Sequence, residues 1–163
     1  MTSRIVALDP GGTTGWSTIT INDDDVLSFN HGMLQRQQHH QQLYKLLEDL
    51  QVGVNDYEIV CESFEYRNAS RPGLELVSVE YIGVMKLFCQ ERNIQFHMQS
   101  ASQGKVRDKP TAFVKSENLK RLGLWSPSQV HAMDAYGHLL YYLINSKVYP
   151  EIALELLNKG WKV

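Results

Sequence analysis

The apolar residues in the first part of the chain fall into short runs and alternating stretches separated by turn-forming residues. A buried run over Ile5–Asp9, an alternating stretch over Trp16–Ile21 and a return over Val26–Met33 each predict a β-strand. The segments Pro10–Gly15 and Asn22–Asp25 are rich in residues that form tight turns. The three strands are therefore expected to pair as an antiparallel meander.

The rest of the chain alternates between helical periodicity and short apolar runs. Two further strands are expected over Tyr57–Glu62 and Ile94–Met98. Residues 99–124 are mixed and basic, and they show no clear element. This order predicts a single α/β domain, residues 1–163, with a mixed five-stranded sheet in which helical crossovers set the later strands parallel to the first. Helices are expected over residues 35–51, 72–92, 127–145 and 151–158.

The composition is that of an ordinary globular protein, with 43% hydrophobic and 21% charged residues in a chain of 163. Cys61 lies in an apolar strand and Cys89 in an apolar helix, which favours two buried thiols in a reducing compartment such as the cytoplasm. The chain opens directly into an apolar run, and no apolar stretch is long enough to cross a bilayer. Neither a signal peptide nor a membrane partner is expected.

Basic residues gather in one segment although the chain as a whole is slightly acidic. The net charge of −2 and the pI near 6.3 argue weakly against a nucleic-acid partner. Between residues 104 and 121, however, the local charge is +4. This segment is either a solvated surface or a phosphate-binding patch, and its place before the last long helix favours phosphate binding. Its basic residues are Lys105, Arg107, Lys109, Lys115, Lys120 and Arg121, set against Asp108 and Glu117.

Four residues can form one acidic site. Asp9 and Glu62 each close an apolar run, so they are expected at the ends of neighbouring parallel strands, while His131 and Asp134 share one face of a predicted helix. Singly, each also has an ordinary explanation as a turn cap, an exposed strand end or a polar helix stripe. Together they suit divalent metal, because two metals can activate water and stabilise the leaving oxygen of a phosphodiester. His138, near the same helix face, is a ligand, a partner of a ligand or a core histidine, and the last two roles are favoured.

The loop that follows Glu62 combines aromatic and basic residues. Phe64 and Tyr66 are either core aromatics or rings that stack on unpaired bases at a branch point. The arginines of the same loop would then hold phosphates. These arginines are Arg67 and Arg71.

Three short motifs follow one another in a characteristic order: Asp9-Pro-Gly with Thr14-Gly-Trp, then Glu62-Ser-Phe before a long helix, then His131-Ala-Met-Asp-Ala. Their order and spacing resemble those of the RuvC-like Holliday junction resolvases of the RNase H-like superfamily, particularly the forms found in bacteriophages. The similarity runs from Ile5 to about Leu143. The third motif has the form with His in its first position, and the basic segment is matched only loosely.

The resemblance implies an RNase H-like fold and a homodimeric endonuclease of DNA recombination and repair, which nicks two opposed strands of a four-way junction. Such an enzyme would depend on Mg²⁺ or Mn²⁺, with two ions about 4 Å apart in each active site. The catalytic and metal-binding residues would be Asp9, Glu62, His131 and Asp134, and the imidazole of His131 favours Mn²⁺. The helix over residues 72–92 is a candidate dimer interface, although its apolar stripe could equally pack on the sheet. The expected location is the cytoplasm of a bacterium or of a phage-infected cell.

Two alternatives from other classes remain open. The segment from Asp9 to Thr14 is also similar to the phosphate loop of actin-like and sugar-kinase ATPases, which share this sheet topology. Those enzymes clamp nucleotide between two such domains, and this chain has room for one. The other alternative is a non-catalytic module that binds branched DNA, and the complete set of metal ligands argues against it.

Overall fold

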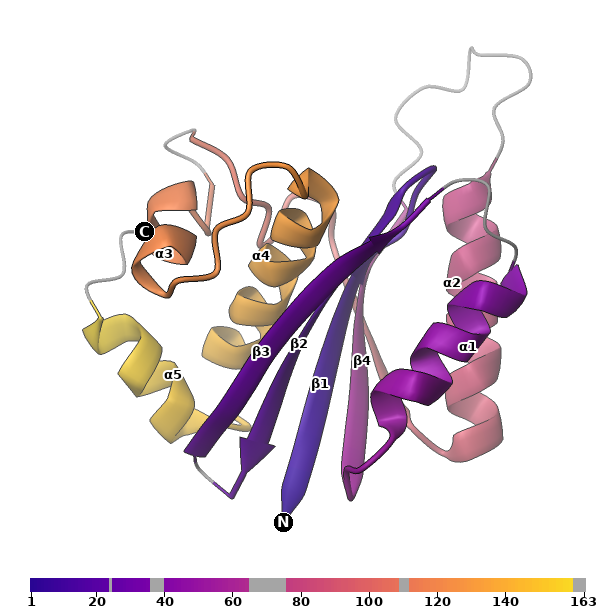
Figure 1. Ribbon diagram of the computed structural model, residues 1–163, viewed down its shortest axis with the longest axis horizontal. Coiled ribbons are helices and arrows are strands. Elements are labelled where there is room, and N and C mark those ends of the chain that lie inside the picture. The colour runs from indigo at the N-terminus through magenta and orange to yellow at the C-terminus, as the bar shows by residue number, and fades with distance from the viewer. Residues whose placement is uncertain (24, 36–39, 65–75, 109–111, 160–163) are drawn as a thin grey trace.

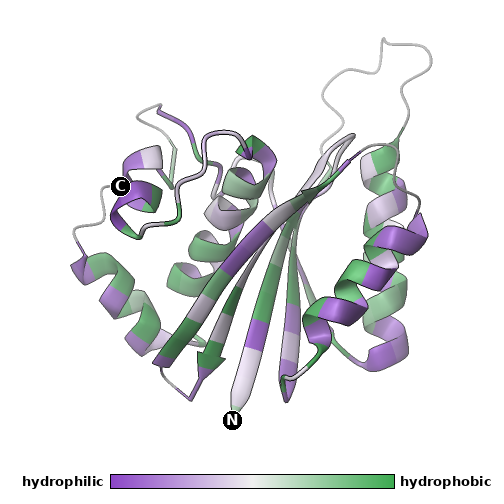
Figure 2. Cartoon of the chain, in the orientation of Figure 1, coloured by the Kyte–Doolittle hydropathy of each residue, from purple (hydrophilic) through white to green (hydrophobic). Residues whose placement is uncertain are grey.

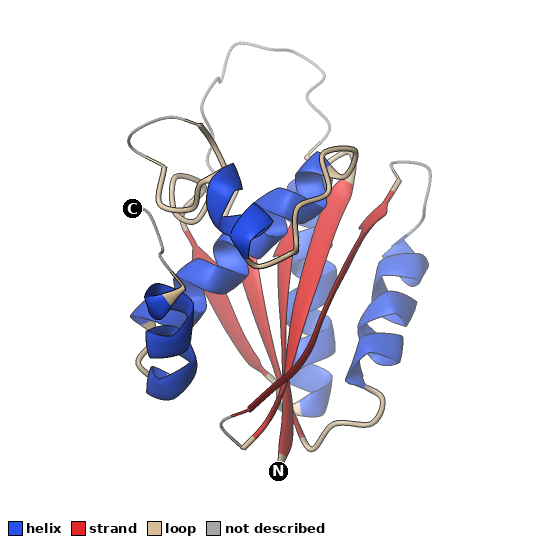
Figure 3. Ribbon diagram, turned by 60° about the vertical axis from the view of Figure 1, so that its left-hand side comes forward, coloured by secondary structure: helices blue, strands red, loops and turns tan. Residues whose placement is uncertain are grey.

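A computed structural model describes residues 1–23, 25–35, 40–64, 76–108 and 112–159. Within them a twisted five-stranded sheet stands between two groups of helices (Figure 1). Turning the molecule shows the sheet as the central layer, with helices on both sides (Figure 3). The predicted mixed α/β fold is confirmed.

The strands follow the predicted order along the chain. They are β1 (Thr2–Asp9), β2 (Thr14–Asn22), β3 (Asp25–Leu34), β4 (Asp56–Glu62) and β5 (Gln95–Gln99). Across the sheet their order is β3-β2-β1-β4-β5. The pairs β1–β2 and β2–β3 are antiparallel, whereas β1–β4 and β4–β5 are parallel. Both the antiparallel meander and the parallel crossovers expected from the sequence are present.

Helices cover both faces of this sheet. On one face lie α1 (His40–Gln51) and α2 (Val77–Arg92), as Figure 1 shows. The opposite face carries α3 (Ser116–Arg121), α4 (Val130–Asn145) and α5 (Pro150–Asn158). In Figure 2 hydrophobic residues run along the central strands and recur on the helices that flank them.

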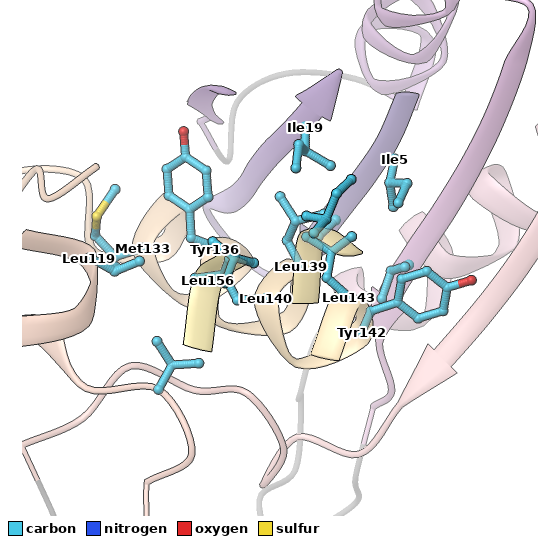
Figure 4. Close-up of a cluster of buried hydrophobic side chains, with 14 of the residues drawn as sticks. Ile5, Ile19, Leu119, Met133, Tyr136, Leu139, Leu140, Tyr142, Leu143 and Leu156 are labelled. Carbon is cyan, nitrogen blue, oxygen red and sulfur yellow. The ribbon is translucent and has the colours of Figure 1, made fainter. Parts of the chain in front are cut away.

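The alternation of side chains along β1 divides the core into two halves. Ile5 and Ala7 belong to the cluster on the α4 side, which also holds Tyr136 and is shown in Figure 4. Val6 and Leu8 belong to the cluster on the α2 side. Successive residues of a strand point to opposite faces, so Asp9, two residues after Ala7, is directed to the α4 side. The same rule places Glu62, two residues after Val60, on the face that α4 covers.

One helix begins later than the sequence predicts, and the predicted starts of two others depend on residues outside the described part. Within the described residues α1 begins at His40 and α2 at Val77. The predicted starts at residues 35 and 72 depend on residues 36–39 and 65–75, which lie outside the described part. The last long helix begins at Val130 and not at residue 127.

The later start of α4 and the presence of α3 have local causes. Gln129 has φ −117° and ψ 57°, which is not helical, and its N–H closes a turn onto the carbonyl of Ser126 at 3.0 Å. The short helix α3 lies in the segment for which no element was expected. Its Leu119 is fully buried in the core on the α4 side, so tertiary packing stabilises a helix whose local sequence is mixed.

Cys61 and Cys89 are both buried free thiols, as predicted. In the part of the chain that the structure describes, no helix has both the length and the apolar character needed to cross a membrane.

A close backbone contact joins α4 to the loop that precedes α3. A Cβ atom on Gly137 would lie 1.6 Å from the carbonyl oxygen of Gly104, and Gly104 itself has φ +71°. Replacing Gly137 with Ala is therefore expected to lower the free energy of unfolding, although Ala is the better helix former. The matched control is Gly83 of α2, where an added Cβ would meet nothing within 4 Å.

The comparison is made by chemical denaturation. Gly83→Ala is expected to raise the free energy of unfolding by about 0.5–1 kcal/mol. Gly137→Ala is expected to lower it, because the backbone of one segment has to move. An increase in both variants would contradict the close contact between these two segments.

Candidate active site

β1 and β4 each end in a buried carboxylate, at the end of the sheet opposite the N-terminus in Figure 1. β1 and β4 run parallel with Leu8 opposite Cys61, so Asp9 and Glu62 are the next residues along each strand. Each is only 8% exposed. The predicted juxtaposition of these two acids at the carboxyl ends of neighbouring strands is what the structure shows.

The first turns of α4 lie against this pair. An added Cβ on Gly15 would come within 2.0 Å of the carbonyl group of His131, so only glycine allows β2 and α4 to approach this closely. His131 Nδ1 lies 3.5 Å from Asp9 Oδ2. On the same helix, Asp134 Oδ1 accepts a hydrogen bond from the backbone N–H of Val106 at 3.3 Å. The structure thus brings His131 to Asp9 and fixes Asp134 between α4 and the basic segment.

A lysine ammonium lies among these acids. Lys105 Nζ is 3.0 Å from Glu62 Oε1, and the lysine side chain is 20% exposed. Burial lowers the pKa of Lys105, but the charges of Asp9 and Glu62 outweigh it and hold this pKa above the ordinary value. The contact between Gly104 and Gly137 sets the position of this loop over α4. Lys105, predicted to bind phosphate, therefore contacts the carboxylate of Glu62.

A second cationic or hydrogen-bonding group reaches Glu62 from inside the protein. The ring of His138 is completely buried, and its Nε2 lies 2.9 Å from Glu62 Oε2. Its Nδ1 lies 3.0 Å from Gln99 Oε1. Of the roles that the sequence left open for His138, the structure supports a buried partner of Glu62.

The pKa values of the two strand-end carboxylates, Asp9 and Glu62, are shifted in opposite directions. Burial, followed by the nearby charge of Glu62, raises the pKa of Asp9 to about 8. Burial also acts to raise the pKa of Glu62, but the hydrogen bond from His138 and the charge of Lys105 more than offset it, so this pKa lies below its ordinary value. The pKa of Asp134 is raised, chiefly by burial. One ammonium therefore compensates only part of the negative charge that three carboxyl groups can carry, which favours an additional cation.

The raised pKa of Asp9 predicts how stability depends on pH in buffer with EDTA. The pKa is about 8 in the folded protein and near the ordinary value of 3.8 in the unfolded chain, so ionisation of Asp9 increasingly destabilises the fold as pH rises between these values. Asp9→Asn is expected to melt at a higher temperature than wild type at pH 8, and at nearly the same temperature at pH 4. Each kcal/mol regained corresponds to about 2–4 °C in Tm.

Thermal melts at both pH values check this expectation. Asp49→Asn is the control, since Asp49 is an exposed carboxylate on α1 that pairs with Lys45. It is expected to change Tm little at either pH. If Asp9→Asn raised Tm by the same amount at pH 4 and at pH 8, the charge of Asp9 would not be the cause of the increase.

A pocket opens beside the carboxylates. It has a volume of about 210 Å³, and Glu62, Lys105 and the half-exposed ring of Phe64 contribute to its wall. The remaining lining residues are Pro10, Ser63, Ser78 and Ala101. Of the loop residues predicted to contact DNA, the structure describes Phe64 alone. Tyr66, Arg67 and Arg71 lie outside the described residues.

The basic segment is folded back on itself next to Lys105. Val106 and Val114 form an isolated parallel bridge, and the N–H of Arg107 donates to the carbonyl of Val114 at 3.3 Å. This bridge sets Arg107 and Lys115, each one residue beyond it, near the loop that carries Lys105. Lys109 lies outside the described residues. The structure thus brings Lys105, Arg107 and Lys115 into one region, and it places Lys120 and Arg121 in the last turn of α3.

The types of donor in this site fit a divalent cation, although a ready-made cage is absent. In the described part of the chain, no three His, Cys, Asp or Glu side chains are grouped so that they could hold a metal ion as they stand. The carboxylates of Asp9, Glu62 and Asp134 are nevertheless gathered around the ammonium of Lys105. Their negative charges raise the pKa of Lys105 and so stabilise its charged form. Carboxylate oxygens with one imidazole are donors that Mg²⁺ and Mn²⁺ accept. Metal loading would require Lys105 to move away from Glu62.

The fold is similar to that of RuvC from Thermus thermophilus in two solved structures. Against RuvC in complex with Holliday junction substrate, the TM-score is 0.58 at 15% identity, covering 89% of this chain and 95% of that one. Against a structure of T. thermophilus RuvC, the TM-score is 0.53 at 11% identity, covering 88% and 96%. No protein-family model matches the sequence, and no curated protein matches it significantly. The chain therefore has a RuvC-like fold of the RNase H-like type.

Proposed function

We propose that this protein is a metal-dependent, structure-selective DNA endonuclease that resolves four-way junctions by paired nicks. The observation that carries the proposal is the meeting of Asp9 and Glu62 with His131 and Asp134 at one end of the sheet. This site lies in a fold shared with a protein whose solved complex contains Holliday junction substrate. Other branched DNA, such as flaps, belongs to the same substrate class.

Asp9, Glu62, His131 and Asp134 would hold the metal, with two ions expected by analogy with other phosphodiesterases. Bound metal supplies the charge that activates water and stabilises the leaving oxygen. The protein's own contribution is to bury the carboxylates and to hold Glu62 through the buried ring of His138. Lys105 keeps a positive charge at the mouth of the site, where it would meet the scissile phosphate.

Affinity for DNA would come from the basic segment, because the chain as a whole carries a net charge of −2. Lys105 contacts Glu62, a candidate metal ligand, so neutralising it would also disturb the metal site, and Arg107 and Lys115 are substituted instead. Neutralising both with Gln is expected to lower the slope of log affinity against log salt by about 1.8, since each lost phosphate contact removes about 0.9.

The salt dependence is measured by fluorescence anisotropy with a labelled four-way junction in EDTA. The control is Lys45→Gln with Lys159→Gln, which removes two lysines that pair with acids on α1 and near the end of α5. This control is expected to leave the slope unchanged. If the control and the Arg107 and Lys115 variant had equal slopes, the DNA path would lie elsewhere on the surface.

The two nicks call for two sites, and a homodimer would present them symmetrically to a substrate with twofold symmetry. The helix α2 is the candidate interface. Met85 and Phe88 are fully buried against the sheet, so this part of its apolar surface is already used within the chain. Val79 and Leu87 are 43% and 52% exposed, and an added Cβ on Gly83 would meet only open space. These three residues form the part of α2 that a second copy could cover.

The substrate panel that tests the proposed function is a synthetic four-way junction, a flap and a linear duplex, each with Mg²⁺, Mn²⁺ or EDTA. Cleavage of the junction with either metal and no cleavage in EDTA is expected. Binding of the junction without cleavage under any condition would instead support a non-catalytic branched-DNA module. Equal cleavage of all three substrates would contradict the proposed selectivity for branched DNA.

A further inference from the structure

The two oxygens of Glu62 are held by partners of very different character. Oε2 lies 2.9 Å from Nε2 of His138, whose ring is completely buried. Oε1 lies 3.0 Å from Nζ of Lys105, which stands at the end of a flexible stem and is 20% exposed. The partner of Oε2 is therefore fixed within the core, whereas the partner of Oε1 can turn out toward the mouth of the site.

The ring of His138 is itself held in place from a third element. Gln99, the last residue of β5, is opposite Glu62 in the parallel register of β4 and β5. Its side chain is 7% exposed and its Oε1 lies 3.0 Å from Nδ1 of His138. A carboxylate only accepts hydrogen bonds, so Nε2 donates to Glu62, while the amide of Gln99 can serve Nδ1 as acceptor or as donor. Both ring nitrogens are thus engaged, and His138 has none left for a metal.

We infer that His138 is a positioning residue that retains Oε2 of Glu62, so that Glu62 binds a divalent cation through Oε1 alone after Lys105 gives way. This inference rests on the proposed metal-dependent function. Partners that orient ligating carboxylates are a general feature of metal sites, and their loss typically costs 10–100-fold in metal affinity or activity. The short motifs that resemble the resolvases do not include His138 or Gln99.

The protein contains a matched control for this arrangement. Glu58 lies on the same strand as Glu62 and is also buried, and His97 Nε2 lies 3.0 Å from its Oε2. The hydroxyl groups of Tyr142 and Tyr149 complete the surroundings of this carboxylate. Among the residues that the structure describes, the side-chain partners of Glu58 are His97, Tyr142 and Tyr149, and they do not include Asp9, Lys105 or Asp134. A histidine–glutamate pair of nearly the same geometry can thus be disrupted away from the candidate active site.

The experiment measures the Kd for Mn²⁺ by isothermal titration calorimetry without DNA, the Mn²⁺ concentration for half-maximal junction cleavage, and Tm. His138→Leu is expected to raise both metal constants about 10–100-fold. His138→Gln, whose amide N–H can replace the Nε2–H, is expected to restore much of the loss. His97→Leu is expected to lower Tm without changing either metal constant.

The outcomes separate the inference from the function on which it rests. A lower Tm in His138→Leu with unchanged metal constants would overturn the positioning role and leave His138 as a core residue. If His138→Leu does not fold, Gln99→Leu is tested in its place. This change releases the ring of His138 and is expected to raise the Kd for Mn²⁺, and an unchanged Kd would overturn the inference. Wild-type protein that neither binds Mn²⁺ nor cleaves the junction would remove the proposed function and the inference together.

Discussion

Asp9→Asn is expected to abolish cleavage of a four-way junction while the protein still folds and binds the junction. Asp9 is 8% exposed and lies beside Glu62 and His131, where it would hold metal and not phosphate. Removing a carboxylate near DNA also removes electrostatic repulsion, so affinity for the junction should hold or rise. The loss of cleavage should exceed the 10–100-fold that is typical for an outer partner of a metal ligand.

Glu62→Gln and Asp134→Asn are expected to behave in the same way. The control is Glu58→Gln, because Glu58 is a buried carboxylate on the same strand that faces the same side of the sheet as Glu62. It should lower Tm and leave cleavage near the wild-type rate. Rates are measured under single-turnover conditions with Mn²⁺, and affinities by gel shift in EDTA. Near wild-type cleavage by Asp9→Asn would take Asp9 out of the site.

Phe64→Ala is expected to slow cleavage of a fully paired junction more than cleavage of a junction that already carries unpaired bases at the crossover. The ring of Phe64 is 36% exposed and lines the pocket of about 210 Å³ that also contains Glu62 and Lys105. From there it can stack on an unpaired base next to the site. Stacking contributes about 1–3 kcal/mol per base, or roughly 5- to 150-fold in rate on the paired junction.

Phe29→Ala is the control for a ring that only packs the fold. Phe29 lies on β3, and its ring meets that of Tyr136 at a centroid distance of 6.2 Å. It is expected to lower Tm and to affect both junctions equally. Single-turnover rates on the two junctions give the comparison for each variant. A Phe64→Ala variant with equal losses on both junctions and a lowered Tm would show that Phe64 is a core aromatic.

The sheet and its two strand-end acids were predictable because each depends on a local pattern. The apolar runs that end at Asp9 and Glu62 define strands, and the helical crossover between them makes the strands parallel. Parallel strands of similar length end at the same edge of a sheet, which brings the acids together. The three-residue spacing of His131 and Asp134 similarly predicts that both lie on one face of a helix.

The partners of these residues were not predictable, because they come from segments far apart in the sequence. Nothing local to His138 distinguishes a buried partner of Glu62 from any other core histidine, since the pairing depends on how α4 crosses the sheet. His97 and His31 contact Glu58 and Tyr136 across the fold, and nothing local to either histidine indicates these partners. The sequence predicts that Lys105 binds phosphate. Its contact with Glu62 depends on the close approach of Gly104, in the same loop, to Gly137 of α4.

A supercoiled plasmid that extrudes a cruciform tests directly whether two metal-dependent sites cut one junction in a single encounter. Two nicks within the lifetime of one complex convert the plasmid straight to the linear form, whereas separate nicks release the supercoiling and leave an open circle. Wild-type protein with Mn²⁺ is expected to yield linear plasmid, and EDTA or Glu62→Gln should leave the plasmid supercoiled. Accumulation of open circles alone would contradict paired cutting, and an uncut plasmid with wild-type protein and metal would contradict the nuclease itself.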